Sequence, residues 1–272
     1  MTARSTTRRR RRRSPPNRPV TAAAVGRFRA ARRDPARVVL EGLHAVKHAL
    51  RFGAAIETAV SPDPPAAVAL AASLAPDVAQ RLEALLEPVE RAVFHQLASA
   101  PPATGVLAIA ARPPIGEPAP RPDRPLVVLA GPSHLGNLGA AIRVAAAADA
   151  AGVVVIGAAD PWHPTAVRGA AGLQFALPCR RVERARELAR AIVGFDAAGE
   201  PLAQAAVAAG SALAFGGERH GLTSATRAVA ERLVALPMRP GVASLNLATA
   251  VAAALYTLAP PAAQAWRSEI TG

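Results

Sequence analysis

The chain has 272 residues, of which 51% are hydrophobic and only 3% aromatic, so its core must rest on Ala, Val, Leu and Ile. Its 32 basic and 19 acidic residues give a formal net charge of +13. The single cysteine, Cys179, excludes an internal disulfide framework and any multi-cysteine metal site. The longest uncharged apolar run near the end has 13 residues. A membrane-spanning helix needs about 20, so we expect no transmembrane segment.

The net charge is concentrated at the start of the chain. Residues 1–34 hold 12 arginines and one acid, a balance of +11, which leaves only +2 for the rest. Repulsion between arginines, together with nearby prolines, predicts a disordered Arg-rich tail over residues 1–36. An arm that neutralises nucleic-acid phosphates, a targeting segment and an incidental extension are all compatible with this composition.

Residues 37–111 form a first predicted unit, a small α/β domain. Short apolar runs and apolar residues at helical spacing predict three strands and three helices. In chain order they cover residues 38–40, 42–52, 56–60, 66–75, 78–86 and 105–110. The following residues, 112–125, contain six prolines and predict a stiff linker.

Residues 126–272 form a second predicted unit, in which strands and helices alternate. The strands are expected at 126–130, 153–156, 174–177, 212–215 and 233–236, and the helices at 138–151, 183–192 and 245–258. This alternation predicts a parallel sheet with helices on both faces. Ligands bind such sheets beyond the carboxyl ends of the strands. Glycines and polar residues gather at those ends, in 131–139, 216–221 and 237–246.

The first of these three clusters runs from Gly131 to Arg143 and reads GPSHLGNLGAAIR. It lacks the spacing of a P-loop and of a dinucleotide-binding loop. It is also one residue too long for a nucleophile elbow at Ser133. Asn137 suits a helix cap or a ligand contact. Arg143 interrupts an apolar helix face, so we expect it to meet a carboxylate or a phosphate.

The other two clusters, FGGERHGL and LPMRPGVASLN, also permit two readings. Glycines directly after a strand allow a ligand or a backbone to approach closely. Glu218 is either an acid of the site or the partner of an arginine. Ser244 is predicted to cap the last helix, which leaves Asn246 in its first turn, where free N–H groups can bind a ligand. Capping alone is the alternative.

The histidines show no metal-ligand spacing. His44 and His48 are four residues apart on a predicted helix, but HAVKH lacks the glutamate of H-E-x-x-H. We therefore expect a solvated or RNA-facing pair, and no metal.

Taken together and in order, these segments resemble one known family. PSHLGNLGAAIRVAAAADAAGVVVIG, ADPWHPTAVRGAAG, LAFGGERHGL and LPMRPGVASLNLATAVAAAL, within residues 126–258, resemble the SpoU (TrmH) family of RNA ribose 2′-O-methyltransferases. VVLEGLHAVKHAL and AVFHQLASAPPATGVLAIA resemble the small RNA-binding domain that often precedes the catalytic domain in this family. The Arg-rich tail lies outside the resemblance.

The resemblance implies a SPOUT fold for residues 126–272: an α/β domain with a C-terminal trefoil knot that works as a homodimer with S-adenosyl-L-methionine. The residues that match functional positions of the family are Asn137, Arg143, Glu218, Ser244 and Asn246. Those that match its cofactor-binding segments are Leu213, Gly216, Gly217, Leu236, Met238 and Leu245.

The activity that the resemblance implies is methylation of a ribose 2′-OH in structured RNA, with 23S rRNA as the favoured substrate. Methylation of tRNA and a non-catalytic role in ribosome assembly are the alternatives. We expect a cytoplasmic protein that binds RNA and neither a membrane nor a metal. A guanidinium with a pKa above about 12 is a poor base, so we expect Arg143 to position a phosphate and stabilise developing negative charge.

Two segments depart from the family pattern. Residues 168–172 read RGAAG, without the serine that relatives often have, and Gly217 stands where asparagine is common.

Overall fold

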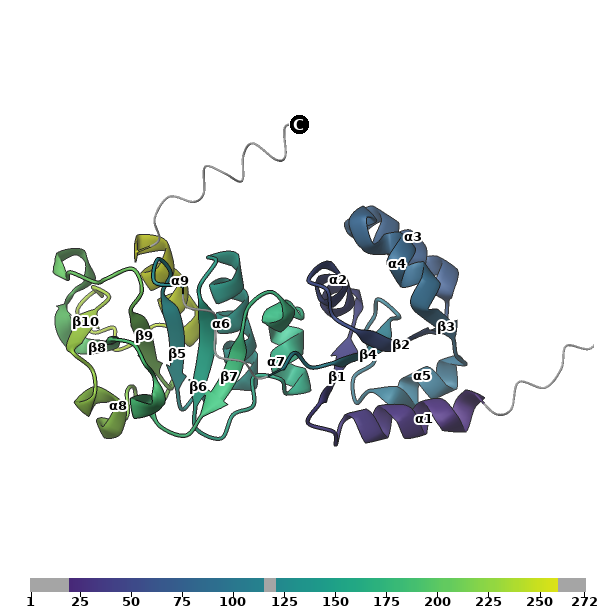
Figure 1. Cartoon of the computed structure of the whole chain (residues 1–272), viewed down its shortest axis with the longest axis horizontal. Helices are drawn as coiled ribbons and strands as arrows, with labels where there is room; N and C mark the ends of the chain where they lie inside the picture. Colours follow the sequence, from purple (N-terminus) through teal and green to yellow (C-terminus); the bar gives the residue numbers. More distant parts are fainter. Residues whose placement is uncertain (1–19, 115–120, 259–272) are drawn as a thin grey trace, which may run out of the picture.

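The structure is a computed structural model that describes residues 20–114 and 121–258. Two α/β domains lie side by side, and we call residues 20–111 the small domain and residues 121–258 the large domain (Figure 1). No helix within the described ranges is long and apolar enough to cross a membrane.

The small domain is built on a four-stranded sheet with the order β1-β4-β2-β3. β4 runs antiparallel to β1 and β2, whereas β3 runs parallel to β2. Helices α2, α3 and α4 pack on one face of this sheet, and α1 and α5 pack on the other. The bounds are α1 (Val20–Ala31), β1 (Arg37–Glu41), α2 (Leu43–Arg51), β2 (Ile56–Ser61), α3 (Pro64–Leu74), α4 (Pro76–Leu85), β3 (Leu86–Pro88), α5 (Arg91–Leu97) and β4 (Leu107–Ala111).

The prediction of a disordered tail over residues 1–36 is wrong for its last part. Residues 20–31 form α1, and Phe28 is only 1% exposed because it packs with Val93 and Phe94 of α5. Burial of this apolar side chain stabilises a helix that the arginine content alone disfavours. Residues 1–19, with the run of arginines, lie outside the described residues.

The large domain is built on a six-stranded parallel sheet with the order β10-β8-β9-β5-β6-β7, which confirms the predicted parallel sheet. Val127 and Leu129 of β5 pack against α6 and α9, while Leu126 and Val128 face η2, so both faces are covered. The strands are β5 (Leu126–Ala130), β6 (Gly152–Ile156), β7 (Cys179–Val182), β8 (Ile192–Pro201), β9 (Ala212–Gly216) and β10 (Arg232–Ala235). The helices are α6 (Leu135–Ala147), α7 (Pro164–Gly169), η1 (Leu173–Phe175), η2 (Ala185–Glu187), η3 (Leu202–Gln204), α8 (Ser224–Ala228) and α9 (Leu247–Leu258).

Two predicted elements of the large domain are wrong. Residues 174–177 were expected to form a strand, but they begin in the 3-10 turn η1, where the Gln174 amide donates to the Pro161 carbonyl. The helix expected at 183–192 is reduced to the short turn η2. The Arg190 guanidinium lies within 3.0 Å of the Arg124 carbonyl and within 3.1 Å of that of Gly210, which fixes this segment in an extended path.

The two domains are joined by a polar and closely packed junction. The Glu41 side chain, 3% exposed at the end of β1, pairs with Arg32 and with Arg168 of α7. His48 Nδ1 lies 2.7 Å from the Ala171 carbonyl oxygen. Gly172, with φ of 75°, approaches so closely that a Cβ there would lie 2.6 Å from the Ala45 carbonyl.

The predicted linker is anchored at both of its described ends. Arg112 donates to the Arg37 carbonyl at 2.8 Å and pairs with Asp160. Arg121 forms two hydrogen bonds of 2.9 Å with Asp149. The remainder of the linker, residues 115–120, lies outside the described residues.

Helices α6 and α7 cross closely, and this contact connects the junction to the rest of the large domain. A Cβ on Gly139 would lie 2.3 Å from the Ala166 carbonyl, and one on Gly169 would lie 2.9 Å from the Gly136 carbonyl. Only glycine permits such an approach of two backbones. The small domain is therefore linked to α6 through α7 and its ion pair with Glu41.

Candidate active site

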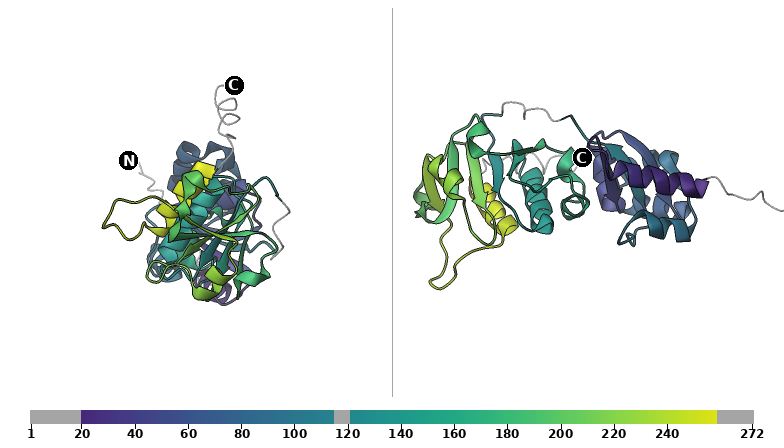
Figure 2. Two further views of the ribbon diagram at one scale, coloured as in Figure 1. Left: turned by 90° about the vertical axis from the view of Figure 1, so that its left-hand side faces the viewer. Right: turned by 90° about the horizontal axis from the view of Figure 1, so that it is seen from below.

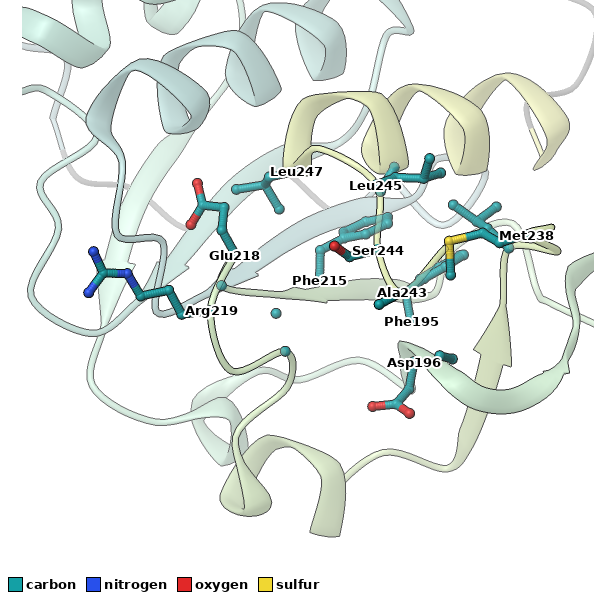
Figure 3. Close-up of a pocket in the computed structure, with 16 residues that line it drawn as sticks. Phe195, Asp196, Phe215, Glu218, Arg219, Met238, Ala243, Ser244, Leu245 and Leu247 are labelled. Carbon is teal, nitrogen blue, oxygen red and sulfur yellow. The ribbon is translucent and has the colours of Figure 1, made fainter. Parts of the chain in front are cut away.

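A pocket of about 360 Å³ opens at the carboxyl ends of β9 and β10, beside the middle of β8, where ligands of parallel sheets bind (Figure 3). Its walls are the 216–221 turn after β9, the segment 236–245 before α9 and the first residues of α9. The segment between β10 and α9 extends as a long loop from the body of the domain (Figure 2). The lining residues are Phe195, Asp196, Ala197, Phe215, Gly216, Gly217, Glu218, Arg219, Gly221, Leu236, Met238, Ala243, Ser244, Leu245, Leu247 and Ala250.

Backbone rather than side chain forms the tightest part of this pocket. The turn closes with a 3.0 Å hydrogen bond from the Gly221 N–H to the Gly217 carbonyl. A Cβ on Gly216 would lie 1.9 Å from the Gly221 carbonyl carbon, and one on Gly217 would lie 2.4 Å from the Gly131 carbonyl oxygen. The close approach of the Gly131 backbone therefore explains why this chain has glycine at position 217.

Apolar and aromatic side chains line the interior. Phe195 and Phe215 stack with ring centroids 4.5 Å apart and an interplanar angle of 15°. Figure 3 shows Met238 and Leu245 on one side of the opening and Asp196 on another, with Arg219 pointing away from it. Asp196 is held in place because it pairs with Arg227 of α8. This lining suits a ligand with an apolar or aromatic part and polar groups that bind peptide N–H and C=O groups.

Four polar side chains form a hydrogen-bonded cluster beside the pocket. Glu218 Oε1 accepts from the Asn137 amide at 2.8 Å, and Oε2 accepts from Ser133 Oγ at 2.9 Å. The Asn246 amide donates to Asn137 Oδ1 at 3.1 Å. Asn246 Oδ1 in turn accepts from the Ala248 N–H at 2.9 Å and so caps α9. We call Ser133, Asn137, Glu218 and Asn246 the amide–carboxylate cluster.

The hydrogen bonds in this cluster keep Glu218 ionised. Partial burial raises the pKa of its carboxyl group, but the bonds from Asn137, from its own backbone N–H and from Ser133 outweigh this and bring the pKa to about 2. A general base works best with a pKa near the operating pH. Glu218 is therefore suited to orienting Asn137 and Ser133, and not to accepting a proton at neutral pH.

The structure brings most of the predicted site residues together. Glu218, Ser244, Gly216, Gly217, Leu236, Met238 and Leu245 line the pocket, and Asn137 and Asn246 join Glu218 through the amide–carboxylate cluster. The prediction that Ser244 caps the last helix is wrong, because the Asn246 side chain does so.

Two predicted residues lie apart from the pocket. Leu213 is fully buried within β9, where it is paired with Val127 and Val193 on its two sides, so neither its backbone nor its side chain lines the pocket. Arg143 is exposed on α6 and forms no hydrogen bond or ion pair within the described part of the chain.

Sequence reasoning missed three members of the site. Phe195 and Asp196 lie in the middle of β8, a strand that the sequence analysis did not predict. The sequence indicates Ser133 only as a candidate nucleophile, whereas its backbone N–H and hydroxyl both donate to Glu218. Its position in the loop that follows β5, two residues after Gly131, was the available signal.

The large domain is an α/β domain whose ligand pocket and polar cluster follow its parallel strands. Residues 124–256 match the SpoU rRNA Methylase family, so the chain carries a SpoU methylase domain.

Known proteins similar to this chain agree with that assignment. A 23S rRNA (uridine(2479)-2′-O)-methyltransferase from Streptomyces viridochromogenes is 34% identical over 139 residues, which are 46% of this chain and 48% of that protein. The chain thus spans about half the length of this relative.

Solved structures match over both domains. The SpoU methyltransferase AviRb from Streptomyces viridochromogenes, in complex with the cofactor AdoMet, matches with a TM-score of 0.71 and 26% identity over 92% of this chain and 99% of that one. An AdoMet-bound rRNA methyltransferase from Sinorhizobium meliloti matches with a TM-score of 0.70 and 25% identity over 89% and 94%. A protein described as an RNA 2′-O ribose methyltransferase matches with a TM-score of 0.71 and 27% sequence identity, over 89% of this chain and 95% of that one.

Proposed function

We propose that this protein transfers a methyl group from S-adenosyl-L-methionine to a ribose 2′-OH in RNA, with 23S rRNA as the substrate. The observation that carries the proposal is the amide–carboxylate cluster at a glycine-walled pocket, built by Asn137, Glu218 and Asn246. The names of the similar proteins, which include a 23S rRNA 2′-O-methyltransferase and AdoMet complexes, support both the reaction and the cofactor.

The pocket fits the cofactor. Its 360 Å³ lies within the range of small-molecule sites, about 300–1,000 Å³. Phe195, Leu236, Met238 and Leu245 offer apolar surface for an adenine and a thioether, and the 216–221 turn offers peptide groups for its polar edges. When bound, S-adenosyl-L-methionine supplies an electrophilic methyl group on sulfur.

The residues of the chain then orient the acceptor hydroxyl. Glu218, which stays ionised, holds the Asn137 amide, and Asn246 ties that amide to the start of α9. This arrangement fixes the polar groups before the reaction begins, which lowers the entropic cost of aligning the substrate. Arg143 would bind a phosphate of the RNA next to the ribose and stabilise the negative charge that develops on the hydroxyl oxygen as its proton passes to solvent water.

Four finer features belong to this proposal. The 236–258 segment completes a trefoil knot around the pocket, and the small domain binds RNA. The protein works as a homodimer, which the exposed apolar side chains of Val242, Leu245 and Tyr256 support because such groups favour burial between subunits. It acts in the cytoplasm.

The test is transfer of tritium from labelled S-adenosyl-L-methionine to total RNA of a strain that lacks this gene. We expect label in 23S rRNA, in a 2′-O-methylated nucleoside. Label in tRNA alone would contradict the substrate. No label in either RNA, with the cofactor bound, would contradict the activity.

Arg143→Ala provides a test of one residue. We expect RNA methylation to fall at least about a hundredfold, a loss typical of a removed group that stabilises charge in the transition state. The Kd for S-adenosyl-L-methionine, measured by calorimetry, should stay within about twofold, because Arg143 does not line the pocket. Methylation at the wild-type rate would refute the role of Arg143.

A further inference from the structure

Helix α2 of the small domain presents a row of basic side chains. His44, Lys47, His48 and Arg51 follow one another at the spacing i, i+3, i+4 and i+7, which places them along one face of the helix. The opposite face, which includes Leu43, Val46 and Leu50, is buried, and the helix contains no acidic residue. We call these four residues the α2 basic row.

The four side chains of the α2 basic row differ in their hydrogen-bond and ion-pair partners. Arg51 forms hydrogen bonds of 2.6 and 2.7 Å with both oxygens of Asp77. His48 is turned towards the large domain, where Nδ1 meets the Ala171 carbonyl. Within the described residues, His44 and Lys47 have neither a hydrogen bond nor an ion pair through their side chains. They are therefore available to an anionic ligand.

The α2 basic row continues across the domain junction to Arg143. The turn η1 contacts both α2 and α6, so these helices flank the same segment. Burial lowers the pKa of His48, and the positive charges of Lys47, Arg51 and Arg143 lower it further, against the bond to Ala171. Arg143 thus lies within electrostatic reach of α2 and has no acidic partner among the described residues, whereas Asp77, which Arg51 binds, also lies within electrostatic reach of Lys47.

The charge balance argues that this row is a site and not a by-product of general basicity. Beyond residue 34 the chain carries a net charge of only +2, so the α2 basic row and Arg143, which together hold three cations against Asp77, form a local excess of positive charge. Cations in excess over acids bind phosphate groups and release the counterions of a nucleic acid. The ion pair between Glu41 and Arg168 holds the junction together, so the separation of α2 and α6 is fixed.

We propose that His44 and Lys47 bind phosphates of the RNA strand that Arg143 holds, so that one RNA backbone crosses from the small domain to the large domain beside the Ala171 segment. This inference rests on the proposed function and extends it. It assigns the RNA contact of the small domain to one face of α2.

The experiment compares Lys47→Ala and Lys47→Glu with Arg91→Ala in the full chain. Arg91 is a matched control because it is exposed on α5, which covers the opposite face of the small sheet, and has no acidic partner in the described ranges. Binding of a 23S rRNA transcript is measured by filter retention between 50 and 300 mM KCl, a range chosen to give a salt slope. Binding of S-adenosyl-L-methionine by calorimetry shows that each variant is folded.

We expect Lys47→Ala to weaken RNA binding about 3- to 10-fold at 100 mM KCl and to lower the slope of log K against log salt by about 0.7–0.9, the value of one phosphate contact. Lys47→Glu should weaken binding further, and Arg91→Ala should match the wild type. Equal weakening by Lys47→Ala and Arg91→Ala, or none by either Lys47 variant, would overturn the inference. If the wild type binds and methylates RNA while the Lys47 variants behave like it, only the inference fails. If the wild type methylates no RNA at all, the proposed function fails.

Discussion

Glu218→Gln tests whether the charge of this carboxylate organises the amide–carboxylate cluster. One oxygen accepts from the Asn137 amide, and the other accepts from the N–H and the hydroxyl of Ser133. A glutamine keeps the shape of the side chain but turns one acceptor into a donor. Either Asn137 or Ser133 then faces a second donor.

The size of the effect follows from the pKa. The fall of the Glu218 pKa from 4.5 to about 2 corresponds, in full, to about 3 kcal/mol. The carboxylate stands at the mouth of the pocket, where water screens its charge, so we reduce this to about 1 kcal/mol. The mismatched donor adds about 1 kcal/mol. We therefore expect Glu218→Gln to lower the free energy of unfolding of the large domain by about 2 kcal/mol at pH 7.

The pH dependence has a definite direction. The pKa of Glu218 is lower in the folded state than in the unfolded chain, so its stabilisation is complete above about pH 4.5 and is lost as the pH falls towards 2. The difference between the wild type and Glu218→Gln, measured by urea unfolding, should therefore narrow by roughly half between pH 5 and pH 3. Glu231→Gln is the control, because Glu231 is exposed and its side chain has no partner among the described residues, and it should change stability by less than about 0.5 kcal/mol. A Glu218→Gln protein as stable as the wild type at pH 7, or a difference that stays constant with pH, would refute the reasoning.

Two further changes probe the pocket wall and the domain junction. Gly216→Ala places a Cβ 1.9 Å from Gly221, so the turn must shift, and we expect the Kd for S-adenosyl-L-methionine to rise at least about tenfold. The control is Gly136→Ala, because Gly136 lies in a helix and a Cβ there would have no atom within 4 Å. This control should leave the Kd unchanged. Glu41→Gln removes the shared partner of two arginines, and we expect a loss of about 1–3 kcal/mol in urea unfolding. In a double-mutant cycle with Arg168→Gln, additive effects would contradict a direct ion pair across the junction.

The sequence predicted secondary structure best where a continuous apolar run alone determined the element. Apolar runs such as Leu126–Ala130 and Gly152–Ile156 are buried on both faces of the sheet and were predicted as strands within a residue or two. Two of the three clusters after the strands line one pocket, and the third joins it through the bonds of Ser133 and Asn137 to Glu218, because parallel strands place their carboxyl ends at one edge.

The errors arose where tertiary contacts outweighed local pattern. β8 was not predicted, and it contains Gly194 and Gly199, a residue type that weakens strands, but at each of these positions a Cβ would collide with Leu233 or Val234 of the neighbouring strand. Residues 183–192 carry charges at helical spacing, yet Arg190 binds carbonyl groups of two distant segments and extends the chain. No periodicity within the segment reports such partners. The isolation of Arg143 from the pocket has the same origin, since it depends on how α6 packs.

The peptide-walled pocket also limits how this protein can change. An inhibitor that binds the peptide groups of residues 216–221 meets atoms that every amino acid possesses, and the close approach at Gly216 and Gly217 leaves no space for a side chain to block it. Variants that escape such a compound would have to arise at Met238, Leu245 or another apolar side chain of the wall. These same side chains face the natural ligand, so escape and activity would be altered together.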